Sequence, residues 1–289
     1  MDRLQVVVVS YNNERTIADC LAAAETACKG FRAKITLVDN ASTDGTADVA
    51  EDRYLEAKVI RLRENIGFAA GNNLVLEECR APLVLLLNPD TSISPDAITI
   101  LAEALERHRD AALAGPRLVY ADGSAQVSFG PFPGPLRDLR QRKLVLGCRR
   151  GDSEAVGKVE RMMSSLFFPD WVSGACFLAR TAALRGVGFF DADFFLYLED
   201  VDLCRRLRAA GWRVLVEPRA RCLHLEGHSH PDPATMRDRF RRSRLLYENK
   251  HGSRLGFLIY KLLRARDVPM RYDPRRRFAP ARAGERGPR

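Results

Sequence analysis

The chain has 289 residues, of which 46% are hydrophobic and 29% are charged, and its formal net charge is +9. These fractions are typical of a soluble globular protein, and they exclude a disordered chain and a membrane-embedded fold. No apolar run approaches the ~20 residues that span a bilayer, and the segment from Met1 to Val6 lacks the pattern of a secretory signal. We therefore expect a cytoplasmic protein.

The seven cysteines are scattered and contain no Cys-x-x-Cys pair. Their spacing favours reduced thiols in the core over disulfides or a zinc site.

Apolar runs of strand length alternate with segments of helical spacing through the first half of the chain. We predict strands at 4–9, 34–38, 58–62 and 82–87, and helices at 14–28, 43–51, 68–79 and 94–107. In the last helix, Ser94 is the expected N-cap and Pro95 the expected first helical residue. This alternation predicts an α/β fold with a parallel sheet and helices on both faces.

Polar residues follow each of the first three predicted strands. They are Ser10, Tyr11 and Asn12 after the first, the segment from Asp39 to Gly45 after the second, and the segment from Asn65 to Asn73 after the third. Helix capping explains any one of these junctions, but their concentration at one sheet edge favours a nucleotide site. No G-x-G-x-x-G follows the first strand, which argues against a dinucleotide site.

The fourth predicted strand ends in Asn88-Pro89-Asp90. Asp90 is there either a ligand to a metal or phosphate, or part of a tight turn, because Asn-Pro-Asp is also good turn chemistry. The following irregular region, 130–163, breaks the alternation and predicts a long loop or a short helical insertion.

The second half carries three acids in four residues, Glu199, Asp200 and Asp202, at the start of a predicted short helix that ends near Gly211. Apolar neighbours can raise the pKa of such a carboxyl toward that of a useful base. The structural alternatives are capping by Asp200 or Asp202 and a salt bridge of Glu199 with Arg205 or Arg206. A strand is predicted from Trp212 to Val216, and His224 follows it as a candidate metal ligand.

Positive charge is concentrated at the C-terminal end. Residues 237–289 contain 17 Lys and Arg against 5 Asp and Glu, a balance of +12, which leaves −3 for the first 236 residues. Apolar and basic residues are interleaved from Arg254 to Arg266, which predicts a basic amphipathic helix. Such a helix either lies on an anionic membrane surface or packs on the domain. No RNA-binding signature is present, so we expect no nucleic-acid partner.

Seven segments together carry a resemblance to family-2 inverting glycosyltransferases of the GT-A fold, and within them to the bacterial rhamnosyltransferase-like subgroup. Four of the segments lie in the first half of the chain: Val8-Val9-Ser10-Tyr11-Asn12, 38–46, 65–73 and 87–90. The other three lie in the second half: Trp171-Val172-Ser173-Gly174-Ala175, 194–203 and the spacing His224-x-x-Gly227-x-Ser229.

The resemblance implies a role for each matching residue. Asp39 would accept a hydrogen bond from the imide N–H of uracil or thymine, and Asp90 and His224 would hold Mg²⁺ or Mn²⁺ on the diphosphate. Asn88 occupies the first position of the family's Asp-x-Asp motif. Asp200 would be the general base, with Asp202 as the alternative and Glu199 beside them. The remaining nucleotide-sugar residues would be Ser10, Tyr11, Asn12, Asn65, Gly67, Asn72 and Asn88, and the acceptor residues Trp171 and Gly174.

The resemblance also implies a domain plan and a reaction. Residues 1–235 would form the GT-A domain, with 1–120 binding the nucleotide sugar and 121–235 the acceptor, and residues 236–289 would form a basic helical extension. The expected reaction moves rhamnose from dTDP-rhamnose to a glycan or polyprenyl-linked acceptor in cell-envelope synthesis, at the inner face of the membrane. The alternatives are a UDP-hexose donor, a sugar-1-phosphate nucleotidyltransferase, and a non-catalytic homologue that binds glycan as a scaffold.

Overall fold

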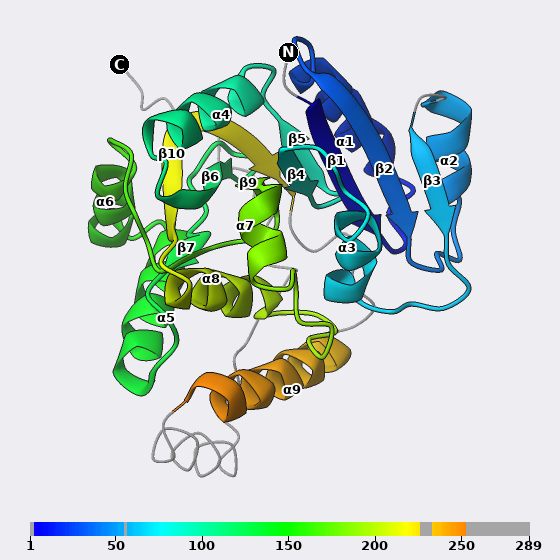
Figure 1. Ribbon diagram of the computed structural model, residues 1–289. Coiled ribbons are helices and arrows are strands. Elements are labelled where there is room, and N and C mark those ends of the chain that lie inside the picture. Colours follow the sequence, from blue (N-terminus) through cyan, green and yellow to red (C-terminus); the bar gives the residue numbers. More distant parts are fainter. Residues whose placement is uncertain (1–2, 55–56, 226–232, 253–289) are drawn as a thin grey trace, which may run out of the picture.

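The computed structural model describes residues 3–54, 57–225 and 233–252. In these ranges the chain forms an eight-stranded mixed sheet in the order β3-β2-β1-β4-β9-β6-β10-β5, and β7 and β8 pair separately (Figure 1). The strands are β1 (Arg3–Ser10), β2 (Arg32–Asp39), β3 (Lys58–Arg61), β4 (Leu83–Leu87), β5 (Thr91–Ile93), β6 (Ala111–Val119), β7 (Phe129–Gly130), β8 (Trp171–Val172), β9 (Cys176–Arg180) and β10 (Arg213–His224).

Helices cover both faces of the large sheet, because its central strands are apolar on both sides. Along β1, Leu4 and Val6 pack into one buried cluster while Val7 and Val9 pack into the other. The first cluster lies under α1, α2 and α4, and the second under α3, α7 and α8. The helices are α1 (Ile17–Ala27), α2 (Thr46–Arg53), α3 (Phe68–Leu76), α4 (Ala97–Arg107), α5 (Pro135–Arg149), α6 (Ser153–Met162), α7 (Thr181–Gly186), α8 (Glu199–Ala209) and α9 (Pro233–His251).

The first four predicted strands are confirmed, and they are parallel to one another. The sheet as a whole is not parallel. β9 runs antiparallel between β4 and β6, and β5 runs antiparallel along β10. The predicted alternation ends at β4, and the antiparallel strands come from the less regular sequence that follows it.

The start of α4 differs from the prediction. Its first helical residue is Ala97 and its N-cap is Asp96, whose side chain makes no capping hydrogen bond. Ser94 and Pro95 instead form a turn that is closed by the N–H of Ala97 on the carbonyl of Ser94. The Ser-Pro pair is therefore used for a turn before the helix and not for its cap.

The region 130–163 is a helical insertion, one of the two predicted forms. It consists of α5 and α6, which pack on each other as a hairpin. Gly147 permits the close contact, because a Cβ there would meet the Cβ of Ala155 at 2.6 Å. The hairpin lies along one side of the molecule, beside α8 and β7 (Figure 1).

The strand predicted to end at Val216 continues to His224. Its register against β6 shifts between Glu217 and Arg221, which marks a β-bulge. Beyond the bulge β10 pairs with β5, and His224 lies opposite Thr91. The bulge and the short strand therefore bring His224 next to the Asn88-Pro89-Asp90 segment.

The predicted domain boundary at residue 235 falls in the first turn of α9. The buried Tyr247 of this helix belongs to the main core, and Ser243 donates to the carbonyl of Leu196 at 2.7 Å. Residues 236–252 therefore pack on the main body, whereas the predicted amphipathic segment from Arg254 to Arg266 lies outside the described residues. None of the helices within the described ranges is both long and apolar enough to cross a membrane.

Candidate functional site

Asp39 ends β2 at the sheet edge where the predicted nucleotide residues meet. Its side chain is buried, and Oδ2 accepts the N–H of Ser42 at 3.3 Å. Oδ1 is also buried, and no hydrogen-bond partner reaches it from the described part of the chain. A buried carboxylate oxygen without a partner is costly, so this atom is a ready acceptor for a ligand N–H.

Around Asp39, the predicted residues Ser10, Tyr11 and Asn12 serve mainly to shape the loop. Ser10 and the N–H of Tyr11 both donate to the side-chain oxygen of Asn13, at 3.0 and 3.1 Å. Asn12 has a φ of 56°, and its side-chain oxygen accepts the N–H of Thr43 at 2.8 Å. The carboxamide of Asn12 is thus occupied by the loop after β2, which leaves the half-buried Tyr11 ring as the element of this segment that a base can contact.

The turn from Asn65 to Phe68 closes the next part of the edge. Its shape is set by Asn40, which accepts the N–H of Ile66 at 2.9 Å and donates to the carbonyl of Gly67 at 3.0 Å. Asn65 accepts the N–H of Gly67 at 3.0 Å. Asn72 is buried and donates to the carbonyl of Phe68 at 2.9 Å, which is a bond within α3.

Gly67 is required by both conformation and space. Its φ is +88°, and a Cβ at this position would meet the carbonyl oxygen of Phe195 at 2.5 Å. The N–H of Phe68 donates to that same oxygen at 2.8 Å. This contact joins the nucleotide edge to the segment 194–198, which leads directly into the acidic start of α8.

Asp90 and His224 meet next to the end of β4. Their side chains are nearly buried, and Nε2 of His224 lies 3.4 Å from Oδ1 of Asp90. The main chain of Asn88 is fixed nearby, because its N–H donates to the carbonyl of Ala175 and its carbonyl accepts from Thr91.

Gln126 sets the tautomer of His224. Its amide nitrogen donates to the His224 carbonyl at 2.7 Å, which leaves its amide oxygen 3.0 Å from Nδ1 of the ring. Because an amide oxygen only accepts, Nδ1 carries a proton, and Nε2 is the ring nitrogen that faces Asp90. In the metal-binding form of the ring Nε2 accepts, so that it and the Asp90 carboxylate would hold a cation between them.

This donor set fits a divalent metal held jointly with a ligand. A carboxylate oxygen and an imidazole nitrogen are both acceptable to Mn²⁺, and Mg²⁺ takes few protein ligands when phosphates supply the others. Within the described ranges no three or more His, Cys, Asp or Glu side chains come together as a metal cluster. Asp90 and His224 would therefore hold the metal only with oxygen ligands from a diphosphate and water.

The three acids at the start of α8 have different surroundings. Burial raises the pKa of Glu199 well above its ordinary value, and the neighbouring Asp200 adds to the effect. Burial also raises the pKa of Asp200, although its two oxygens accept the N–H groups of Gly174 and Val201, both at 2.8 Å. Asp200 is thus held in place by main-chain donors, and within the described part of the chain it forms no ion pair.

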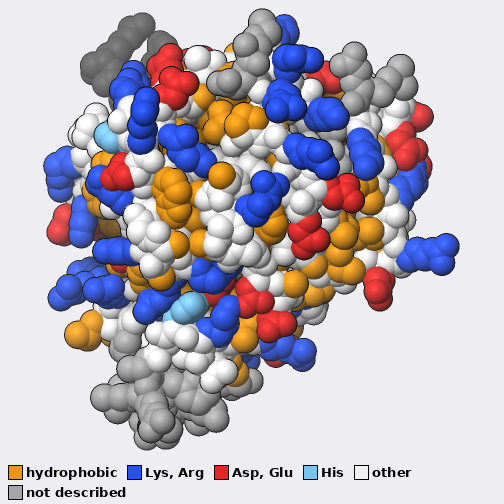
Figure 2. Space-filling model, in the orientation of Figure 1, with side chains coloured by type: hydrophobic (Ala, Val, Ile, Leu, Met, Phe, Trp, Pro, Cys, Tyr) orange, Lys and Arg blue, Asp and Glu red, His pale blue; other side chains and the backbone are white. Residues whose placement is uncertain are grey.

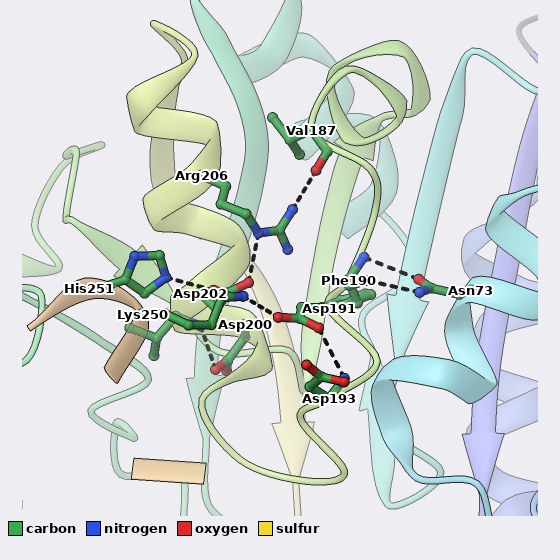
Figure 3. Close-up of polar contacts among 11 residues, drawn as sticks. Asn73, Val187, Phe190, Asp191, Asp193, Asp200, Asp202, Arg206, Lys250 and His251 are labelled. Carbon is green, nitrogen blue, oxygen red and sulfur yellow. Dashed lines mark hydrogen bonds and ion pairs between the residues drawn. The ribbon is translucent and has the colours of Figure 1, made fainter. Parts of the chain in front are cut away.

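Asp202 is the opposite case. It is fully buried, and it contacts Arg206 at 2.7 Å, Nε2 of His251 at 2.7 Å and Lys250 at 3.1 Å (Figure 3). Burial pushes the pKa of Asp202 upward, but these three partners outweigh it and lower the pKa. The expected salt bridge with an arginine of α8 therefore belongs to Asp202 and not to Glu199.

Gly174 and Trp171 lie beside this helix. The N–H of Gly174 donates to Asp200, and a Cβ at Gly174 would sit 3.5 Å from the Cβ of Asp200. Trp171 donates from its indole to the carbonyl of Pro131 at 2.9 Å. Trp171, Gln126 and His224 also line a cavity of about 130 Å³, together with Val145, Cys148 and Arg149 of α5.

The segment from Gly174 to Ala175 joins the base candidate to the metal candidate. Gly174 contacts Asp200 through its N–H, and Ala175 contacts the N–H of Asn88 through its carbonyl. Four residues of the site were not predicted: Gln126, Asn40 and the α9 residues Lys250 and His251. Asn40 lies within the matching segment 38–46, and Gln126 lies in a segment without any recognisable pattern.

Two protein-family models match the chain. Residues 5–154 match the model of glycosyl transferase family 2, and residues 83–247 match that of glycosyl transferase family group 2. A relative is the N-acetylglucosaminyl-diphospho-decaprenol L-rhamnosyltransferase of Mycobacterium tuberculosis. It is 32% identical over 250 residues, which cover 81% of this chain and 80% of that protein.

Two solved structures share the fold. GalNAc-T7 with UDP, GalNAc and Mn²⁺ aligns with a TM-score of 0.59 at 14% identity, over 85% of this chain and 48% of that one. The mannosyltransferase PcManGT from Pyrobaculum calidifontis, in complex with GDP-Man and Mn²⁺, aligns with a TM-score of 0.54 at 15% identity, over 93% and 81%. These likenesses confirm the predicted GT-A fold.

Proposed function

The chain belongs to glycosyl transferase family 2 and is a glycosyltransferase, and we propose that it transfers rhamnose from dTDP-rhamnose, with inversion, to a lipid-linked N-acetylglucosamine acceptor. The name of the mycobacterial relative supports both the sugar and the acceptor class. The observation that carries the proposal is the Gly174–Ala175 bridge, because it holds Asp200 beside the segment that presents Asp90.

In the proposed donor site, the free Oδ1 of Asp39 accepts the imide N–H of the thymine ring. Asp90 and His224 hold a divalent cation, and Gln126 fixes the His224 ring that does so. When bound, that cation would stabilise the negative charge that develops on the diphosphate leaving group.

Asp200 is the proposed general base. It takes the proton of the acceptor hydroxyl as that oxygen attacks the anomeric carbon from the face opposite the nucleoside diphosphate, so that the configuration inverts. A buried carboxylate with a raised pKa suits this role, and Asp200 forms no ion pair within the described ranges. The contacts of Asp202 with Arg206, Lys250 and His251 lower its pKa and make that carboxylate a poor base.

The test is a donor-hydrolysis panel of dTDP-rhamnose, UDP-glucose, UDP-galactose and GDP-mannose, with Mn²⁺ or EDTA, followed by transfer to a polyprenyl-diphosphate N-acetylglucosamine. Of the four donors, we expect only dTDP-rhamnose to be hydrolysed, with release of dTDP that depends on the metal. Asp90→Ala and Asp200→Asn should each lower the rate by at least about a hundredfold. Asp96→Ala is the matched control, since Asp96 is exposed and makes no capping bond.

Calorimetric binding of dTDP separates the roles. Asp39→Ala should weaken dTDP binding about tenfold to a hundredfold, because it removes a buried acceptor, whereas Asp200→Asn should leave it unchanged. Release of UDP from a UDP-hexose would replace the proposed donor. Full activity of Asp200→Asn would overturn the assignment of the base.

A further inference from the structure

Exposed apolar side chains are concentrated on the α5–α6 hairpin. Within the described residues, five large hydrophobic side chains are exposed, and four of them lie on this hairpin. Leu136 and Leu139 stand out, with 71% and 64% of their surface exposed, while Val156 and Met162 are at 36%. The fifth, Leu74, lies on α3. Exposed apolar groups gathered on one element indicate a contact surface.

The same helix is strongly basic. Between Pro135 and Arg149, α5 has five Lys and Arg residues and one acidic residue, Asp138, which gives +4. The negative charge of Asp138 is engaged by Arg244 of α9 at 2.5 Å. Figure 2 shows basic side chains gathered with apolar ones along the left side of the molecule, where the hairpin lies in this orientation.

Leucines and basic residues share one face of α5. Leu136, Arg140 and Lys143 are spaced at i, i+4 and i+7, and Leu139 lies between them on the same side. All four side chains are exposed. We call these four residues the α5 face.

The other side of α5 reaches the candidate site. Val145 and Cys148 of this helix line the cavity of about 130 Å³ that also contains His224 and Gln126. The helix thus lies between the site and the solvent, with its apolar and basic residues directed outward at its N-terminal half.

We propose that the α5 face docks on the surface of an anionic lipid bilayer and so presents the cavity beside His224 to an acceptor that is anchored in that bilayer. The purpose of this docking rests on the proposed lipid-linked acceptor, but the docking itself does not. Leucines enter the interface while Arg140 and Lys143 face anionic headgroups.

Charge complementarity selects this occupant over two others. Residues 253–289 of the same chain carry 11 Lys and Arg against 3 Asp and Glu, a balance of +8, which matches α5 in sign. A second copy that docks by the same face would place +4 against +4. An anionic lipid surface is opposite in charge to the helix, and each basic residue near it contributes about 1 kcal/mol.

The experiment is co-sedimentation of the full-length chain with vesicles of phosphatidylcholine alone, or with about one-third phosphatidylglycerol. We expect binding to the anionic vesicles only. Leu136→Ser with Leu139→Ser should lower the partition coefficient about tenfold, and Arg140→Gln with Lys143→Gln about thirtyfold. Leu74→Ser, and Lys58→Gln with Arg63→Gln, are matched controls on exposed residues elsewhere, and they should change binding less than about twofold.

Other outcomes would overturn the inference. One is that the wild-type protein does not bind anionic vesicles. Another is that the α5-face variants bind like the controls while removal of 253–289 abolishes binding. The third is that light scattering shows the leucine variant to be a monomer where wild type is a dimer, with no loss of vesicle binding. Donor hydrolysis by the same variants is measured in a separate assay, which distinguishes a loss of docking from a loss of the proposed function. If hydrolysis is intact and vesicle binding is lost, the docking surface is supported. If wild type binds vesicles but turns over no donor, the proposed function fails and the docking surface stands.

Discussion

At the scale of single residues, the surroundings of a carboxyl group decide its role more than its place in a motif. Glu199 and Asp202 lie within one turn of α8, yet burial raises the pKa of Glu199 while the cationic partners of Asp202 lower that of Asp202. Oε2 of Glu199 is buried and has no hydrogen-bond partner from the described residues. Glu199 therefore favours its protonated form in the folded protein.

We predict that Glu199→Gln flattens the dependence of stability on pH. Because the folded pKa of Glu199 is raised, its contribution to stability is fully present below its ordinary pKa of 4.5 and is lost as the pH rises through the folded value. The glutamine variant does not ionise, so it should gain stability relative to wild type across that window, by roughly 1–3 kcal/mol at neutral pH.

Urea unfolding at a series of pH values measures this difference. Glu154→Gln is the matched control, since Glu154 is an exposed acid in the first turn of α6. Equal pH slopes for wild type and Glu199→Gln would show that Glu199 is ionised in the folded state, contrary to the prediction.

At the scale of elements, α9 holds the start of α8 in place. Lys250 and His251 of α9 both contact Asp202, and Lys250 also contacts Asp191 in the loop before α8 (Figure 3). Asn73 of α3 exchanges two hydrogen bonds with the main chain of Phe190, at 2.8 and 3.1 Å, and so fixes the residue next to Asp191 in that loop. The proposed base is therefore positioned by residues that do not touch it.

We predict that Asp202→Asn destabilises the protein by about 3 kcal/mol, because it leaves the charges of Arg206 and Lys250 beside a neutral side chain in a buried position. Calorimetry should show a melting temperature lower by about 5–10 °C. The variant should also lower kcat with little change in the affinity for the donor nucleotide, since α8 carries Asp200.

Asp238→Asn is the control for Asp202→Asn. Asp238 forms an exposed pair with Arg242 within α9, at 2.8 Å, and such pairs contribute little. A kcat that stays at the wild-type level in Asp202→Asn would show that the α8–α9 contact is structural alone.

The sequence predicted these elements unevenly, for physical reasons. The first four strands and their helices were predictable because apolar runs of strand length alternate with segments of helical spacing. β5 was not recognised because three residues carry little periodicity, and β9 was not recognised because its antiparallel pairing is set by distant partners. The Ser94-Pro95 pair fits a turn as well as a helix start, and only the local backbone decides between them.

The candidate site residues were also predicted unevenly. Asp39, Asp90, Asp200 and His224 were predictable from motifs, whereas Gln126 was not, because an isolated glutamine has no pattern. The distinction between Asp200 and Asp202 also required the structure. It depends on α9, which is distant in sequence and was expected to belong to an extension.

At the scale of the whole molecule, the predicted nucleotide half and acceptor half share one sheet. β9 of the later half lies between β4 and β6 of the earlier half, and β10 pairs with both β6 and β5. Neither half can lose its strands without exposing the core of the other. The two halves differ in function in the proposal, but the sheet makes them one folding unit.

We therefore predict a single cooperative unfolding transition that probes in both halves report at the same urea concentration. The two tryptophans, Trp171 and Trp212, both lie in the later half, so their fluorescence reports that half. Three buried cysteines, Cys20, Cys28 and Cys79, lie in the earlier half. Burial raises the pKa of Cys20 to about 12 and that of Cys28 to about 11, so these thiols should resist labelling until the core opens.

Pulsed thiol labelling read by peptide mass spectrometry should give a midpoint that coincides with the fluorescence midpoint. Labelling of the three cysteines at a lower urea concentration than the fluorescence change would mean that the nucleotide half unfolds alone, and that the β4–β9 and β5–β10 pairings do not couple the two halves.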